Sequence, residues 1–195
     1  YTPAQWLADP AAWLGNLHPE DRDRVLAALD TARQTGTAMD VEYRLRTRSG
    51  DWRHIHDKAE VVRDAGGQPL CRQGVMLDVT NRVQAEAELR KLYQAVEQSP
   101  NSIVITNLRA EIEYVNAAFL ATTGYSRDEV IGRNPRILQA DDVRPGDRAP
   151  LWQALTQGQP WKGEFHNRRK DGSTYIELAH VAPLRQPDGT ITHYV

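Results

Sequence analysis

The sequence has only one cysteine, Cys71, among its 195 residues. A single thiol excludes an internal disulfide and a cysteine-based zinc site. Apolar runs of roughly 18 residues are missing, which excludes a transmembrane helix. Neither sign of charge dominates, because 24 Lys and Arg residues stand against 26 Asp and Glu residues, for a formal net charge of -2. This balance argues against nucleic acid as a partner.

The first residues lack the basic stretch and apolar core of a secretory signal. We therefore expect a cytoplasmic segment that makes no membrane contact. Motifs of enzymes are also missing: the chain shows no nucleophile–base pair, no metal-ligand cluster and no phosphate-binding loop. We expect a segment that is not itself an enzyme and holds no metal. The neighbouring Asp141 and Asp142 are interpreted as a solvated loop.

The chain repeats itself at an offset of 122 residues, as the pairs Glu42 and Glu164 or Gly50 and Gly172 show. Further pairs at the same offset are Tyr43 and Phe165, Gly36 and Gly158, Arg63 and Arg185, and Gly67 and Gly189. Repeats of short solenoid units have periods of about 20–50 residues, so this offset indicates two copies of a whole domain.

Each copy ends in three segments that read as an antiparallel meander, with glycine turns between them. A helix is expected before each meander, at 19–33 and 148–155. In the second copy two more strands, 102–107 and 111–115, lead into a helix at 117–123. The first copy has no counterpart of these strands, so we expect a domain that is incomplete at its N-terminus. In each copy the first predicted strand runs up to a glycine turn, at 48–51 and at 170–173, and the later strands lie at 52–63 and 70–79 in the first copy and at 175–185 and 190–195 in the second.

An uninterrupted helix is expected at 81–98, with Thr80 or Asn81 as its N-cap. Ala85, Leu89, Leu92 and Val96 are spaced 4, 3 and 4 residues apart, the spacing of a coiled-coil seam. Two interpretations stay open: a connector that packs on its own domain, or a seam that joins two copies of the chain into a homodimer.

The order of these elements resembles the PAS fold, an α+β fold with an antiparallel sheet and short helices. The motifs on which the resemblance rests include Leu17-His18-Pro19-Glu20-Asp21-Arg22 and Asp78-Val79-Thr80-Asn81-Arg82 in the first copy. In the second copy they include Asn116-Ala117-Ala118-Phe119 and Asn167-Arg168-Arg169-Lys170-Asp171-Gly172. The predicted organisation is a PAS domain at 1–80, a helical linker at 81–98 and a second PAS domain at 99–195.

The second copy also resembles the flavin-binding PAS domains. Its segment Gly132-Arg133-Asn134-Pro135-Arg136-Ile137-Leu138-Gln139 is similar to the signature of LOV photoreceptors, but Pro135 stands where those domains carry the cysteine that attacks the flavin. Pro160-Trp161-Lys162-Gly163 and Asn167-Arg168-Arg169-Lys170 resemble the redox-sensing PAS domains of the NifL, Aer and MmoS type. That resemblance implies FAD, bound noncovalently.

The resemblance places six residues in the flavin site: Asn134, Ile137, Leu138, Trp161, Asn167 and Glu177. A flavin ring system needs an apolar slot, aromatic contact and a few amide-type groups at its polar edge. An Asn side chain offers a donor and an acceptor together, and a carboxyl can exchange a proton with the ring. The plainer alternatives are packing for Trp161, a turn cap for Asn134 and a solvent-facing carboxylate for Glu177.

The first copy provides a control, since the positions of Trp161, Asn167 and Glu177 correspond to Met39, Leu45 and Ile55. All three are apolar, so we expect no flavin there. Haem is the main rival cofactor, but the segment 141–157 contains no His to serve as an axial ligand.

The sequence therefore predicts a redox or oxygen sensor that relays its signal to an output domain outside this segment, a histidine kinase or a cyclic-dinucleotide enzyme. The alternative is a cofactor-free tandem module for interaction, dimerisation or small-ligand sensing.

Overall fold

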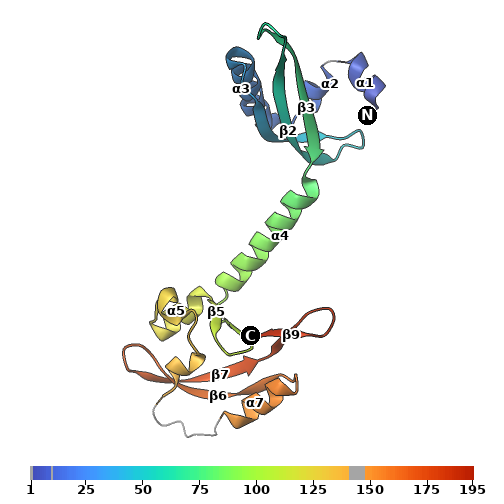
Figure 1. The fold of residues 1–195 in the computed structure, drawn as a ribbon. Coiled ribbons are helices and arrows are strands. Elements are labelled where there is room, and N and C mark those ends of the chain that lie inside the picture. The colour runs from blue at the N-terminus through green and yellow to red at the C-terminus, as the bar shows by residue number, and fades with distance from the viewer. Residues whose placement is uncertain (1, 10, 141–147) are drawn as a thin grey trace. The chain divides into compact units, whose positions relative to one another are not determined.

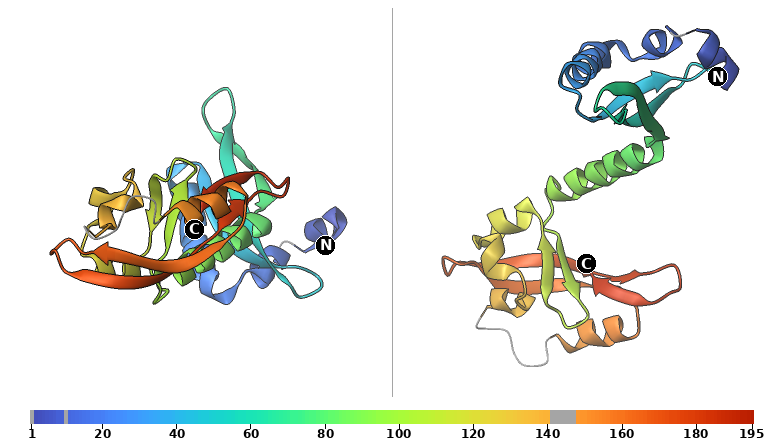
Figure 2. Two further views of the ribbon diagram at one scale, coloured as in Figure 1. Left: turned by 90° about the horizontal axis from the view of Figure 1, so that it is seen from below. Right: turned by 45° about the horizontal axis from the view of Figure 1, so that its top comes forward.

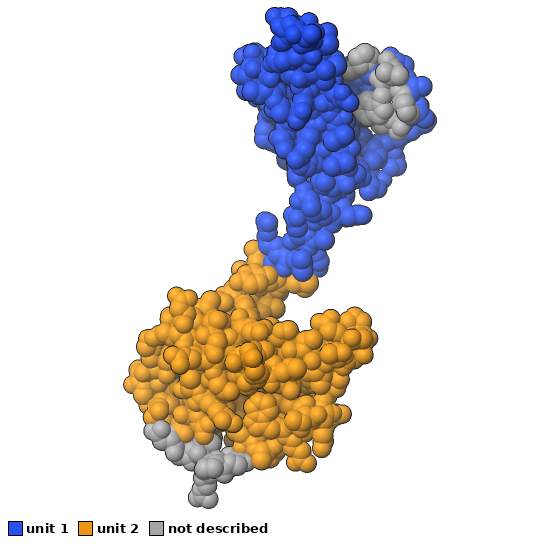
Figure 3. Space-filling model, in the orientation of Figure 1, with its two compact units in different colours: residues 1–90 blue, residues 91–195 orange. Residues whose placement is uncertain are grey.

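A computed structural model describes residues 2–9, 11–140 and 148–195 of the chain. It contains two compact units, which we call unit 1 (Tyr1–Arg90) and unit 2 (Lys91–Val195) and describe separately (Figure 3). The acidic pair Asp141–Asp142 lies outside the described residues. Among those that are described, none of the helices has the length and hydrophobicity needed to cross a membrane.

The described residues of unit 1 form three helices, then a three-stranded sheet, then the first part of α4 (Thr80–Glu97), as Figure 1 shows. The sheet is an antiparallel meander of order β1-β2-β3, which confirms the predicted fold of this copy. Its turns use Gly50 and Gly67, whose φ angles of 97° and 81° a residue with a side chain rarely adopts. The elements are α1 (Pro3–Ala8), α2 (Ala12–Asn16), α3 (Pro19–Thr35), β1 (Met39–Arg46), β2 (Trp52–Arg63) and β3 (Pro69–Asp78).

The core of unit 1 lies between α3 and one face of β1. Alternate β1 residues point inward, as the period of two in a strand requires: Met39, Val41, Tyr43 and Leu45 are all buried. From α3, Val25 packs against them and is fully buried. The helix is capped by His18, whose side chain accepts a hydrogen bond from the backbone N–H of Glu20.

The helix α4 covers Thr80–Glu97. The sequence analysis placed its N-cap at Thr80 or Asn81, and this was wrong. The capping group is the carboxylate of Asp78, which accepts a 2.9 Å hydrogen bond from the N–H of Thr80. An acidic side chain is favoured there because the first N–H groups of a helix have no partner within it. Leu89 and Leu92 of the seam are 68% and 55% exposed, so the described residues of this chain do not cover them.

Unit 2 adds two strands ahead of its helices, as predicted. Asn116 begins α5 by accepting a hydrogen bond from Phe119, and Ser126 and Glu129 form the expected capping box of α6. The elements are β4 (Val104–Asn107), β5 (Ile112–Val115), α5 (Ala117–Thr123), α6 (Arg127–Val130), η1 (Pro135–Leu138), α7 (Ala149–Thr156), β6 (Trp161–Arg168), β7 (Thr174–Val181), β8 (Pro183–Arg185) and β9 (Ile191–Tyr194).

The strand predicted at 175–185 is in fact two strands. β7 pairs with β6, whereas β8 pairs with β9, and the change of partner falls at Ala182. Ala182 exchanges two backbone hydrogen bonds with Val195, of 2.7 and 2.9 Å, which carries the ladder across the break. The strands thus follow the path β5-β4-β9-β8 and then, through the chain itself, β7-β6. Figure 2 shows the long hairpin of β6 and β7 from two further sides.

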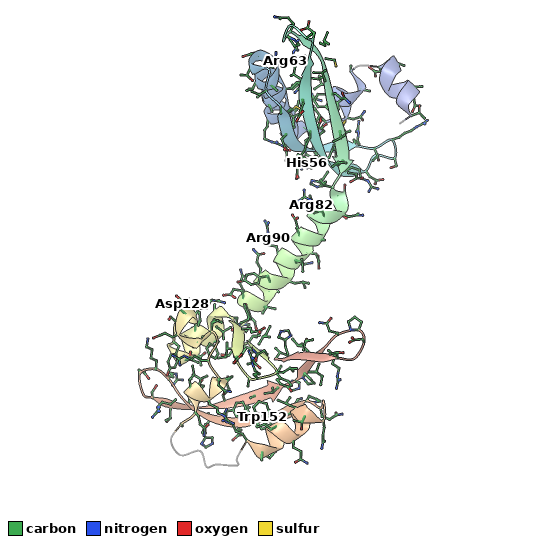
Figure 4. The ribbon with its side chains drawn as sticks, viewed as in Figure 1. His56, Arg63, Arg82, Arg90, Asp128 and Trp152 are labelled. Atoms are coloured by element: carbon green, nitrogen blue, oxygen red, sulfur yellow. The ribbon has the colours of Figure 1, made fainter. Side chains whose placement is uncertain are left out.

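The internal repeat is visible as a repeated set of contacts. In unit 1 the guanidinium of Arg63 donates to the carbonyl oxygens of Gly36 and Gly67. In unit 2 Arg185, at the offset of 122 residues, donates to Gly158 and Gly189 in the same way. The two glycines before the meanders both have positive φ: Gly36, the C-cap of α3, has 65°, and Gly158, directly after the C-cap of α7, has 70°. Figure 4 shows Arg63 among the side chains of unit 1.

Candidate ligand-binding site

Unit 2 contains a cavity of about 290 Å³ between its sheet and its helical side. This is near the lower end of the volumes of ligand pockets, about 300–1,000 Å³. Helical segments contribute Phe119, Leu138, Leu151 and Leu155, and Trp152 of α7, labelled in Figure 4, also lines it. The sheet contributes Val104, Thr106, Phe165, Asn167, Glu177, Ala179 and Tyr194. Most of this surface is apolar, so a polar side chain inside it is conspicuous.

Two of the predicted site residues form a polar pair in the cavity wall. Asn167 of β6 is 3% exposed, and its side-chain N–H₂ donates a 2.9 Å hydrogen bond to the carboxylate of Glu177 on β7. Burial raises the pKa of Glu177, and the hydrogen bond from Asn167 opposes that rise. Glu177 therefore lies in the cavity wall and is not the solvent-facing carboxylate of the plainer alternative. The pair presents a carboxyl, a side-chain carbonyl and an amide to the same apolar space.

Trp161 does not line the cavity. Its ring stacks on that of Phe165, with the centroids 5.0 Å apart and the planes 19° apart, and Phe165 does line the cavity. Residues 161, 163 and 165 share a face of β6, and Gly163 lies between the two aromatic residues. A Cβ at Gly163 would collide with the Trp161 ring. The missing side chain therefore permits the stack, and Trp161 contacts the cavity wall through Phe165. The sequence analysis missed Phe165, although it lies in register with Trp161 and Asn167.

Three predicted residues belong to the segment that contains η1. Asn134 lines the cavity and also caps η1, because its side-chain oxygen accepts a 3.0 Å hydrogen bond from the N–H of Arg136. Leu138 is buried and lines the cavity. Ile137 packs instead on the core below. The segment is held against β6 by a bridge between Gln139 and Asn167, which brings Asn134 and Asn167 into one wall.

Two arginines at the cavity were not predicted. Arg136 and Arg148 both line it, and the guanidinium of Arg148 lies 4.8 Å from the centroid of the Phe165 ring. Its Nε is buried and has no hydrogen-bond partner in the part of the chain described. Burial, together with the positive charge of Arg136, lowers the pKa of Arg148. Two cations in one cavity wall fit an anionic group. Arg136 lies within the motif that pointed to Asn134, so that motif contained the signal.

No thiol lies among the described lining residues. Pro135 is part of the cavity wall and begins η1, and Cys71 is an exposed residue of unit 1. A ligand in this cavity therefore meets no cysteine within the described wall, and covalent attachment through sulfur has no candidate residue there.

Comparisons with known families match the two units separately. A PAS domain profile matches residues 100–195, and a PAS fold profile matches residues 1–76. The chain therefore belongs to the PAS family, with one PAS domain in each unit. PAS domains are sensory modules rather than catalytic ones, so the segment is a tandem sensory segment.

Several curated proteins are similar to this chain. The nitrogen fixation regulatory protein of Klebsiella oxytoca is 37% identical over 103 residues, which are 53% of this chain and 21% of that protein. The bacterioopsin transcriptional activator of Halobacterium salinarum is 36% identical over 113 residues, 56% of this chain and 17% of that protein. Blue-light-activated histidine kinase 1 of Erythrobacter litoralis is 37% identical over 83 residues, 43% of this chain and 23% of that protein.

The matched part thus spans about a fifth of the length of these relatives. Among solved structures, an RNA-binding Light-Oxygen-Voltage receptor superimposes with a TM-score of 0.51 over 95% of this chain and 84% of that one. Its sequence identity is 20%, so this likeness supports the fold alone.

Proposed function

We propose that unit 2 binds FAD noncovalently and reports redox state or oxygen to an output domain outside this segment. One observation carries the proposal: the hydrogen-bonded pair of buried Asn167 and half-buried Glu177 lies in the wall of a mainly apolar cavity. A flavin has a flat apolar body and one edge of alternating donors and acceptors, and this wall offers matching groups. The identity of 37% to a nitrogen fixation regulatory protein supports the same class of ligand through the motif around Asn167.

FAD carries a diphosphate, and the cavity offers it two cations. Arg136 and Arg148 line the wall next to the apolar part of the site. An anion that paired with Arg148 would satisfy the Nε that lacks a partner among the described residues. Removing one partner of a charged hydrogen bond costs about 1–3 kcal/mol, so this contact is worth testing separately from the ring site.

Glu177 is the proposed link between chemistry and signal. Because its pKa is raised, the carboxyl gains and loses its proton closer to neutral pH than an ordinary glutamate does. When bound, the flavin supplies two-electron redox chemistry with a change in the basicity of its ring nitrogens. A proton gained or lost by Glu177 changes its hydrogen bond with Asn167, and hence the pairing of β6 with β7 on which both residues lie. The strain would pass along the sheet to a flanking helix and to an output domain, for which we favour a histidine kinase.

The test is the visible absorption spectrum of the 195-residue protein purified with added FAD. We expect the bands of oxidised flavin, their reversible loss on reduction with dithionite, and release of FAD rather than FMN on denaturation. Glu177→Gln should keep the flavin but remove part of the pH dependence of its reduction potential. A folded protein that stays colourless after incubation with FAD and FMN would overturn the proposal.

A second function is favoured by α4. Leu89, Leu92 and Tyr93 are exposed large apolar residues on this helix, and Leu89 and Leu92 belong to the heptad seam. We propose that α4 pairs with a second copy to form a homodimer, which a cofactor-free interaction module would also require. Sedimentation of the wild type and of Leu92→Glu tests this: a dimer should become a monomer. A wild-type monomer at high micromolar concentration would contradict it.

A further inference from the structure

Unit 1 has a cavity of its own, of about 680 Å³. It opens on the inner face of the sheet, between β1, β2 and β3 on one side and α2 and α3 on the other. Its wall is mainly apolar, with two charged exceptions. The lining residues are Trp13, Leu29, Met39, Leu45, Asp57, Ala59, Arg72 and Met76.

One of the two charged residues, Asp57, already has a partner. The hydroxyl of Tyr43 donates a 2.9 Å hydrogen bond to its carboxylate, and the indole N–H of Trp13 donates a 2.9 Å bond to that hydroxyl. Burial raises the pKa of Tyr43 well above its usual range, and the negative charge of Asp57 adds to that rise. The chain Trp13–Tyr43–Asp57 is therefore a structural network in which each donor has an acceptor.

The other charged residue, Arg72, has no such partner. Its Nε and Nη2 are both buried, and neither makes a hydrogen bond within the described part of the chain. Nε and one Nη form the edge of a guanidinium that pairs with a carboxylate through two parallel hydrogen bonds. Burying that edge without a partner is costly, because each unmet charged donor loses its contact with water. The free edge lies in the wall of a cavity large enough for a small molecule.

The internal repeat places this cavity at the position that corresponds to the cavity of unit 2. Six of its eight lining positions correspond, at the offset of 122 residues, to residues that line the cavity of unit 2. The polar groups have moved: Leu45 replaces Asn167, whereas Arg72 replaces Tyr194 and Asp57 replaces Ala179. The six corresponding pairs are Trp13 and Pro135, Leu29 and Leu151, Leu45 and Asn167, Asp57 and Ala179, Ala59 and Val181, and Arg72 and Tyr194. The two cavities therefore lie at corresponding positions of the two units but carry different polar and charged side chains.

We propose that unit 1 is a second ligand-binding domain, whose ligand is a small monocarboxylate with an apolar body. The carboxylate pairs with Arg72, and the body lies against Leu29, Leu45 and Met76. The carboxylate of Asp57 lies in the wall of the same cavity and disfavours a second negative charge on the ligand. The site therefore selects a monoanion over a dicarboxylate or a phosphate ester, which separates it from the anionic nucleotide proposed for unit 2.

Isothermal titration with sodium octanoate, below its micelle concentration, tests the proposal on the 195-residue protein. We expect saturable binding with one site per chain, and at least tenfold weaker binding of 1-octanol and of the dicarboxylate octanedioate. Arg72→Met should lose octanoate affinity at least tenfold while keeping the weak octanol binding. The matched control is Arg48→Met, in the exposed β1–β2 turn of the same unit, which should bind like the wild type.

The unliganded variant gives an independent readout. Because Nε and Nη2 of Arg72 make no hydrogen bonds among the described residues, Arg72→Met should melt no lower than the wild type without octanoate and should lose the upward shift in Tm with it. Should Arg72→Met fail to fold, Arg72→Lys keeps the charge but not the paired edge, and it should bind octanoate at least threefold more weakly. Equal affinity of the wild type for octanoate and octanol, or undiminished octanoate binding by the Arg72 variants, would overturn the proposal.

Discussion

Units 1 and 2 use the same scaffold for two different interiors. Where unit 2 has the buried Asn167, unit 1 has Leu45, which is 8% exposed and packs in the hydrophobic core. Where unit 2 has Glu177, unit 1 has Ile55, packed on that same core. The backbone contact of Arg63 with Gly36 is nevertheless repeated by Arg185 with Gly158. The scaffold is thus fixed by turns, caps and backbone contacts, and a few inward side chains decide what the interior can bind.

Exchanging those side chains should have the largest effect. In unit 2 the double variant Asn167→Leu, Glu177→Ile installs the residues of unit 1. Each polar group of a flavin edge left without a partner costs about 1–3 kcal/mol, so flavin should bind on the order of 30-fold more weakly or worse. Flavin fluorescence in a titration with FAD measures this. The fold should survive, because unit 1 carries Leu45 and Ile55 in the same two places.

A control for that exchange is available in unit 1. Arg72→Met changes the other cavity and should leave the affinity for FAD unchanged. If the double variant in unit 2 also keeps its affinity for FAD, the difference between the two interiors does not lie in these side chains, and the flavin site must be sought elsewhere.

An intermediate effect is expected at the position that is Tyr43 in unit 1 and Phe165 in unit 2. Tyr43→Phe would leave both the Trp13 indole N–H and the Asp57 carboxylate without the hydroxyl that joins them. A buried polar group that loses its partner costs about 1–3 kcal/mol, so unit 1 should be destabilised by that amount. Hydrogen exchange of β1 and β2 amides reports on unit 1 alone. Tyr43→Phe with unchanged exchange would show that the hydroxyl network contributes nothing to stability.

Most of the fold could be predicted because short stretches of sequence indicate its turns and strands. Glycines with positive φ, such as Gly50 and Gly172, mark the turns, and alternation marks the strands between them. The predicted N-cap of α4 was wrong because Thr80 is already the first residue of the helix, and its N–H donates to the carboxylate of Asp78. The break between β7 and β8 was missed because it depends on pairing with β9, which begins ten residues after Val181 ends β7.

The site was partly predictable for the same reason. Asn134, Asn167 and Glu177 lie in motifs or at matching strand positions, and the structure brings them to one cavity. Trp161 and Ile137 contact neighbours of that cavity and do not line it: Trp161 stacks on Phe165, and Ile137 packs on the core. Arg72 and Arg148 were not singled out. From sequence alone, a charged side chain on a strand or at a helix start is expected to lie in solvent, and only the fold shows that these nitrogens are buried.

The smallest effect on stability is expected from two carboxylate–cation pairs that differ in burial, one in each unit. Asp21 in unit 1 is mostly buried and bonds to Arg44, which lowers its pKa from 3.8 to about 2. Because this pKa lies below the unfolded value, the pair stabilises unit 1 above about pH 4 and loses that contribution as the pH falls through about 2. Asp21→Asn should lower the free energy of unfolding at pH 7 by on the order of 1 kcal/mol, and the difference from the wild type should close near pH 2.

Glu129 in unit 2 also has a pKa lowered to about 2, through Lys170, but both side chains are largely exposed. Surface pairs contribute little, so Glu129→Gln should leave stability nearly unchanged across the same range. Urea unfolding of both variants between pH 2 and pH 7 compares them directly, and an equal loss in both would show that burial does not distinguish the two units here.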